Sequence, residues 1–408
     1  MPSLTAPPAR TDPGPPPTRG RWIWTLSGVV TVAFLTVFGS WAFVRIGDGP
    51  GGPAPLSAIP TRTVTVSQPV TSMNVASYGA PIRVAVGPVN QVTVEEAITF
   101  DQQDKAPTVT AKVTHGALTL AAPSCLNTNC SVGFTVTVPA SVAVTASSEG
   151  GEISVSGATT ANLDSGGAPV TARSVQGALS VTAEGGSVTV MGAGSADLDS
   201  GGGPITVHGV GGTITANADG GSIEVHGAAT ANLDSGGGPI TATGVSGLVT
   251  ATANGGSIDV IGSTGANLDT GGGPATVNSV NGPLTAYTNG GQLQINRLTG
   301  PLSADTGDGP VIANAITSAT FRVTTDGGSA AVSFNSAPRS VQVSTGGGPA
   351  FVSLPGGPYA VTAESFGGPE QVTVPTSPSA ASTVTVSTNG GQLQITPSDS
   401  GAPVQAGS

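Results

Sequence analysis

The sequence is poor in charge, in aromatic side chains and in cysteine. Charged residues make up 9% of the 408 residues, aromatic residues 4%, and there are 2 cysteines. From residue 174 on, the chain holds three arginines and no lysine. A chain of net charge −11 with so few basic groups repels nucleic acid. It also lacks the cations that a polysaccharide lyase needs to bind uronate carboxylates, and the aromatic platforms on which sugars stack.

Motifs of enzyme families are missing as well. There is no G-x-S-x-G elbow, no H-E-x-x-H zinc motif and no phosphate-binding loop with its lysine. The many glycine pairs lie between short alternating segments, which places them at corners between strands rather than before helices. The sequence therefore predicts a non-enzymatic protein without a cofactor.

A long apolar segment, residues 22–44, carries no charge and is long enough to cross a hydrocarbon core of about 30 Å. Trp22 and Trp41 lie near its ends, and Arg19 and Arg21 precede it. The positive-inside bias predicts a single-pass plasma-membrane protein whose N-terminus is cytoplasmic and whose C-terminal domain is extracellular. A cleaved signal peptide is the alternative, but its apolar region would be shorter and end in a small-residue cleavage site.

The Pro-rich residues 1–21 are predicted to be a disordered cytoplasmic tail, and residues 45–62 a flexible stalk. Glycine and proline, with 62 and 33 residues, approach the level of low-complexity chains, so disorder is the competing interpretation beyond the stalk as well. Val, Ile and Thr nevertheless alternate there with polar residues, which a disordered polymer does not require. Glycine is therefore interpreted as a corner residue between strands.

An internal repeat organises the rest of the chain. The motif Leu-Asp-Ser/Thr-Gly-Gly begins at Leu163, Leu198, Leu233 and Leu268, a spacing of 35 residues, and each unit divides into two similar halves. Residues alternate apolar and polar on both sides of each glycine corner, a period of two that favours strands. A propeller blade would need about 40–50 residues, which is more than this unit provides.

The predicted fold is all-β: a parallel β-solenoid of about fourteen 17–20-residue coils, preceded by one transmembrane α-helix. The coils occupy residues 146–397, residues 63–145 form an N-terminal β cap region, and residues 398–408 form a disordered tail. A coil of this length cannot bury its apolar side alone, so stacking is required. Gly220 is expected at positive φ in one corner, where a β-branched residue would damage folding.

The stretch FTVTVPASVAVTASSEGGEISVSG, residues 134–157, resembles the core motif of a bacterial family named "putative adhesin". The pattern consists of an alternating strand, Val-Pro, a second strand, a glycine turn and Ile-x-Val. The segments VTVEEAITF and GALTLAA resemble the opening strands of that family. The resemblance covers roughly residues 63–395 and implies a membrane-anchored, surface-exposed β-strand-repeat domain. It carries no catalytic residues that could be transferred to this chain.

Carboxylates recur just before the glycine corners. Asp164, Asp199, Asp234 and Asp269 share one position of the repeat, so stacking would align them in a stripe with a carboxylate about every 9–10 Å. Identical carboxylates in a flat row do not provide the raised and lowered pKa values that acid–base catalysis uses. The stripe is either a solvated face that opposes aggregation or a repetitive interaction surface for cations or a cationic polymer.

Two further clusters are candidates for covalent or metal chemistry. His208, His226 and Glu224 are expected on one outward face of neighbouring coils, where they could hold zinc, although two exposed histidines in copied repeats need no such role. Cys125 and Cys130, the two cysteines, are predicted to form a disulfide in an oxidising exterior. A metal site would need more ligands than these two.

These patterns predict a non-enzymatic, adhesin-like or scaffold protein that presents its solenoid to a cell-wall, surface-glycan or protein partner. An envelope-stress sensing or regulatory membrane protein is the alternative, and an enzyme acting on cell-wall polysaccharide is a third.

Overall fold

The computed structural model describes residues 56–58, 61–101, 105–123 and 130–398. Within those ranges every element of regular structure is a β-strand, from β1 to β34. No helix there has the length and apolar character that a membrane span requires. The transmembrane helix expected at 22–44, the tail at 1–21, most of the stalk and the tail from residue 399 lie outside the described residues.

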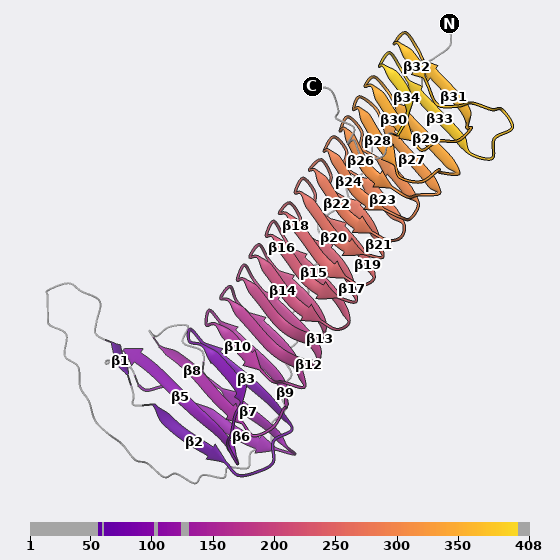
Figure 1. Cartoon of the computed structure of the whole chain (residues 1–408). Coiled ribbons are helices and arrows are strands. Elements are labelled where there is room, and N and C mark those ends of the chain that lie inside the picture. The colour runs from indigo at the N-terminus through magenta and orange to yellow at the C-terminus, as the bar shows by residue number, and fades with distance from the viewer. Residues whose placement is uncertain (1–55, 59–60, 102–104, 124–129, 399–408) are drawn as a thin grey trace, which may run out of the picture. The chain divides into compact units, whose positions relative to one another are not determined.

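The strands stack in two parallel ladders, so that each coil contributes one strand to each ladder (Figure 1). Two strands, β12 (Val170–Ala183) and β13 (Val188–Ser200), are long enough to turn from ladder B into ladder A. Ladder A contains β3 (Ser72–Tyr78), β9 (Ala143–Glu149), β11 (Thr160–Ser165), β15 (Thr213–Ala218), β17 (Thr230–Asp234), β19 (Leu248–Thr252), β21 (Gly265–Asp269), β23 (Leu284–Tyr287), β25 (Leu302–Asp305), β27 (Thr320–Thr325), β29 (Ser340–Thr345), β31 (Ala360–Ser365) and β33 (Thr383–Thr388).

Ladder B contains the other strand of each coil. Its members are β4 (Ile82–Val86), β10 (Ile153–Ser156), β14 (Ile205–Val210), β16 (Ile223–Ala228), β18 (Ile240–Val245), β20 (Ile258–Ser263), β22 (Ala275–Val280), β24 (Leu293–Leu298), β26 (Val311–Ile316), β28 (Ala330–Phe334), β30 (Ala350–Leu354), β32 (Glu370–Val372) and β34 (Leu393–Pro397). The two strands shared between the ladders are β12 (Val170–Ala183) and β13 (Val188–Ser200).

The core lies between the ladders and follows from the period of two. In β11, Ala161 and Leu163 are buried while Asn162 and Asp164 are exposed. Parallel pairing without a register shift places Leu163 beside Val181 of the next coil. Each inward position therefore becomes a column of Val, Ile, Leu and Ala that runs through the stack, and burial of these columns stabilises coils that could not fold alone.

The glycine corners have two separate physical requirements. Gly220 has φ +93, as expected, in a conformation that side chains of L-residues rarely adopt. Gly238 is needed for a different reason, because a Cβ there would lie 2.2 Å from the carbonyl oxygen of Gly221 in the preceding coil. At Gly238 the stacked corners thus approach so closely that a side chain would clash with the backbone of the preceding coil.

At most corners, a buried hydroxyl donates a hydrogen bond to a backbone carbonyl oxygen that the turn leaves without a backbone partner. Each hydroxyl donates to the carbonyl oxygen three residues later, with oxygen–oxygen distances of 2.5–2.9 Å. Without this donor the carbonyl would be left without a partner in the core, at a cost of about 1–3 kcal/mol. The donors are Ser165, Ser200, Ser235, Thr270, Thr288, Thr306, Thr325, Thr345 and Thr388.

The N-terminal end mixes antiparallel strands with one coil of the solenoid. β5 (Val92–Asp101) pairs antiparallel with β1 (Leu56–Ala58), β2 (Arg62–Val66) and β8 (Ser131–Val138), and β6 (Thr110–Thr114) pairs with β7 (Ala117–Ala121). β3 and β4, which fall in the segment expected as a cap, pair parallel with β9 and β10 in the solenoid register. β7 and β8 lie beyond them, so this coil is enclosed on both sides.

One ionisable side chain of this end is buried in the apolar core. Glu96 of β5 is 2% exposed, and its Oε2 has no hydrogen-bond partner. Burial raises the pKa of the Glu96 carboxyl, and the Arg62 guanidinium, 4.0 Å from Oε2, lowers it in part. The strand pattern explains the position, because Glu96 shares the inward face of β5 with Val92, Val94 and Ile98.

About 12 turns stack in chain order, from β9–β10 to β29–β30. The last two expected coils are present but exchange places, since β33 lies between β29 and β31, and β34 lies between β30 and β32. Simple stacking in chain order is therefore wrong at the C-terminal end. The coil with the better apolar pattern occupies the inner layer, where both of its edges are paired.

Candidate functional site

The four aspartates of the predicted stripe lie on one exposed column of ladder A. Asp164 and Asp199 both pair with Thr182 of the coil between them, and Asp234 and Asp269 both pair with Thr252. Asn217 connects Asp199 to Asp234 in the same way. A carboxylate therefore occurs in every second layer, which is about 9–10 Å along the stack.

These aspartates form two pairs with different surroundings. Asp234 and Asp269 each accept a hydrogen bond from the backbone N–H two residues later, at 3.2 and 3.1 Å. The carboxylates of Asp164 and Asp199 make no hydrogen bond with another described residue. Burial raises the pKa of Asp199, and the nearby charges of Asp219 and Asp197 raise it further. The first pair thus stabilises corners, whereas the carboxylates of the second pair have no such role.

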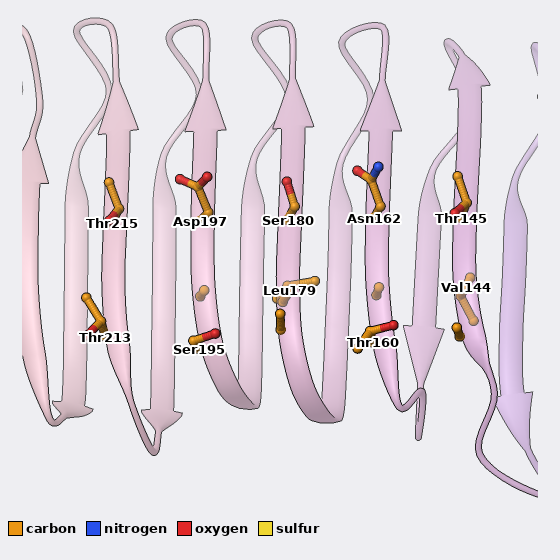
Figure 2. Close-up of a pocket in the computed structure, with 14 residues that line it drawn as sticks. Val144, Thr145, Thr160, Asn162, Leu179, Ser180, Ser195, Asp197, Thr213 and Thr215 are labelled. Carbon is orange, nitrogen blue, oxygen red and sulfur yellow. The ribbon is translucent and has the colours of Figure 1, made fainter. Parts of the chain in front are cut away.

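Beside the free aspartates, ladder A is hollowed into a shallow groove of about 670 Å³, which we call the polar groove (Figure 2). Short outward side chains of β9, β11, β12, β13 and β15 form two rows along it. One row contains Thr145, Asn162, Ser180, Asp197 and Thr215, which are successive register partners. The other row contains Ala143, Thr160, Ala178, Ser195 and Thr213.

The polar groups of the groove are available for binding. Of the side chains in both rows, Thr213 alone has a side-chain hydrogen bond to a described residue, as the acceptor from Thr230 at 3.0 Å. The hydroxyl, amide and carboxylate groups of the long row recur at the strand spacing of about 4.8 Å. Such an array can make a series of hydrogen bonds with an extended ligand that lies along the stack.

The groove was missed in the sequence because its signal is a lack of bulk. Ala143, Ala178 and Ser195 are small, and this leaves space on the outward face. Further along the stack, the outward face carries the larger side chain of Leu248, which is 42% exposed. A search of outward positions for consecutive small residues would have found the groove.

The histidines lie on ladder B, in β14 and β16, whereas the groove lies on ladder A. The rings of His208 and His226 stack with centroids 4.9 Å apart and an angle of 6° between their planes. His226 Nε2 lies 2.7 Å from Glu224 Oε1. In the part of the chain that the structure describes, no group of three His, Cys, Asp or Glu side chains is placed to hold a metal ion.

The structure describes one of the two cysteines of the predicted disulfide. Cys130, just before β8, is disulfide-bonded. The chain contains one other cysteine, Cys125, which lies outside the described residues.

Comparison with known proteins gives weak similarities to solved structures. No family model and no curated protein matches the chain. A "putative adhesin" from Bacteroides fragilis is 14% identical with a TM-score of 0.28, covering 66% of this chain and 97% of that one. A second "putative adhesin", from Parabacteroides merdae, has the same identity and TM-score and covers 66% and 95%.

A "putative lipid binding protein" from Parabacteroides distasonis is 11% identical with a TM-score of 0.25, covering 64% of this chain and 96% of that one. TM-scores this low establish neither a shared fold in detail nor a shared function. The function must be argued from the chain's own surface.

Proposed function

We propose that this chain is a non-enzymatic, adhesin-like surface protein whose polar groove binds a linear, hydroxyl-rich polymer. The observation that carries the proposal is the long row of unengaged polar side chains, from Thr145 to Thr215, along the stacking direction. A polymer with hydroxyl groups along its length can bond to several layers at once. Affinity then grows with the number of layers contacted, although each bond is weak.

Charge favours a neutral or amine-bearing polymer. Asp197 lies in the groove, and Asp164 and Asp199 lie next to it on the same strands. With a net charge of −11 for the chain, a polyanion would be repelled. An amino sugar polymer offers both hydroxyl donors for the Thr and Ser groups and a cation for Asp197.

Hydrolysis is not part of the proposal, because the groove does not present facing acids. Among its described lining residues Asp197 is the one carboxylate. Glycosidases of the common type use two carboxyl groups, about 5–10 Å apart, on either side of the bond they cleave. The proposed role is therefore binding, with the apolar segment 22–44 as a membrane anchor and the groove outside the cell.

A binding array tests the proposal. The purified chain would be applied to neutral chitin oligosaccharides, partly deacetylated chitosan, other linear glycans and cell-wall fragments. We expect binding to the amine-bearing polymer, and weaker binding to its fully acetylated form. No retention on any of these polymers would contradict the proposal.

Two matched variants locate the binding surface. Ser180→Tyr places a large ring in the groove and should weaken binding at least about tenfold. Ser303→Tyr makes the same change at an exposed ladder A position outside the groove and should leave binding unchanged. Equal losses in the two variants would show that the groove is not the site.

A further inference from the structure

The C-terminal end of the solenoid is built out of chain order. The last coil in the sequence, β33–β34, lies one layer inside the end, and the preceding coil, β31–β32, covers it (Figure 1). The connection that makes this possible, residues 373–382 between β32 and β33, is longer than the corner at 211–212 that joins β14 to β15. Residues 355–359 are as long as residues 335–339, which join β28 to β29 in successive layers.

The two coils differ in the edge that they would present. The inward side chains Val384, Val386, Leu393 and Ile395 of the inner coil are fully buried, and residues 383–397 contain no charge. The covering coil has a ladder B strand of three residues, Glu370–Val372, and carries Glu364 and Glu370. Short charged edges resist strand addition, whereas long uncharged edges invite it. The observed order therefore hides the edge that is prone to association.

Both coils have residues in register to pair with the same strand, β29. Gln342 of β29 pairs with Thr385 of β33, and Thr385 pairs in turn with Thr362 of β31. The apolar positions are in register too, because Val341, Val384 and Val361 follow one another in the same manner. β31 could consequently pair directly with β29 without a register shift, and so restore an unbroken ladder.

We propose that this end adopts two layer orders and that the second order docks with another copy of the chain. In the inserted order, which the structure has, the acidic coil β31–β32 is outermost and the chain stays monomeric. In the sequential order, β31–β32 pairs with β29–β30 and the uncharged β33–β34 becomes outermost. Two such edges, related by a two-fold axis, pair antiparallel and extend both ladders across the interface.

The two orders can be trapped in the full chain by cysteine pairs on one exposed column. In the inserted order, Gln342 and Thr385 are in adjacent layers, about 4.8 Å apart, while Gln342 and Thr362 are two layers apart, about 9.6 Å. A disulfide requires Cα atoms about 4.4–6.8 Å apart. The pair Q342C/T385C therefore reports the inserted order, and Q342C/T362C reports the sequential order.

Each double variant would be incubated in mild urea, returned to buffer, oxidised and analysed by peptide mapping and by light scattering after size exclusion. We expect Q342C/T385C to cross-link as a monomer and Q342C/T362C to cross-link as a dimer. Adding T385K to the second variant should return it to a monomer, because a lysine on the outermost strand opposes edge pairing.

Three results would overturn the proposal. Absence of the Q342C/T362C disulfide, while Q342C/T385C forms fully, would mean that the end has one layer order. A cross-linked Q342C/T362C monomer would mean that the sequential edge does not dock. Equal dimerisation of both variants would place the interface elsewhere on the chain.

Discussion

Two corners of the solenoid have the same sequence and different conformations. Residues 198–206 and 233–241 both read Leu-Asp-Ser-Gly-Gly-Gly-Pro-Ile-Thr. In the first corner the second glycine, Gly202, has φ +135, whereas in the other the first glycine, Gly236, has φ +64. The N–H of Gly202 donates to Ser200 O, but the N–H of Gly236 donates to the Asp234 carboxylate.

The neighbouring coils account for the difference. Gly201 donates its N–H to Ala183 O of the coil before it. In the second corner, the backbone N–H of Ser235 donates to Thr252 O of the next coil. The backbone carbonyl oxygen of Ser235 accepts from the N–H of Gly220 in the coil before it. Once the direction of these inter-coil bonds is set, the corner backbone must follow. Local sequence supplies glycines that permit both forms, and stacking selects one.

The largest expected effect is common to both corners. Gly203→Ala and Gly238→Ala would place a Cβ 2.3 and 2.2 Å from a carbonyl oxygen of the preceding coil, which forces the layers apart. Each variant should lose about 3 kcal/mol of stability, measured as a shift of its urea unfolding midpoint.

Gly237→Ala is the control in the same corner, because nothing lies within 4 Å of its added Cβ. It should unfold close to the unsubstituted chain. If Gly237→Ala and Gly238→Ala unfolded at the same urea concentration, close stacking of corner backbones would be wrong.

A smaller shared effect is expected from the buried hydroxyls. Ser200 donates to Gly203 O at 2.9 Å, and Ser235 donates to Gly238 O at 2.5 Å. Ser200→Ala and Ser235→Ala should each cost about 1–2 kcal/mol, because the carbonyl stays buried without its donor. Thermal unfolding checks this, and Ser303→Ala, at an exposed position, serves as the control. A loss in one corner alone would mean that the hydroxyl is not a common requirement.

The smallest effect should differ in sign between the corners. Asp234→Ala removes the acceptor for Gly236 N–H and should cost about 0.5–1 kcal/mol at pH 7. Asp199→Ala removes a carboxyl whose pKa is higher in the folded chain than in the unfolded chain. Ionisation of this carboxyl therefore opposes folding as the pH rises from its unfolded pKa through its folded pKa. The variant should therefore be slightly more stable than the parent at pH 7.

That gain in Asp199→Ala should disappear below the carboxyl's unfolded pKa, where the group is protonated in both states. Thermal unfolding at pH 7 and at pH 3 measures both variants. Equal destabilisation by Asp199→Ala and Asp234→Ala at pH 7 would remove the distinction between a free and a corner-bound carboxylate.

Much of the fold could be predicted from particular residues. The alternation around Leu163 and Leu198 predicts which side chains face the core, and the 35-residue spacing predicts parallel stacking. The column that joins Asp164 to Asp269 follows from that spacing, because identical repeats place identical residues one above another. The roles of these carboxylates could not be predicted, since they depend on the corner conformation, which hydrogen bonds between coils select.

The polar groove and the C-terminal layer order were not predicted. The groove depends on the packing of small residues from five strands, and no single motif marks it. The layer order depends on competition between two coils for the edges of β29 and β30. Since both coils carry the same alternation and a glycine corner, spacing alone does not rank them.

The sequence by itself determined the strands, the corners and the inward columns, because side-chain period and glycine content act over a few residues. Tertiary structure alone decided which glycine of Leu-Asp-Ser-Gly-Gly-Gly turns left-handed, which aspartates stay free, and which coil ends the stack. These choices depend on backbone groups one layer away, about 4.8 Å along the stack but about 17 residues or more along the chain. The nine residues of one corner therefore do not determine its conformation, whereas the layers stacked beside it do.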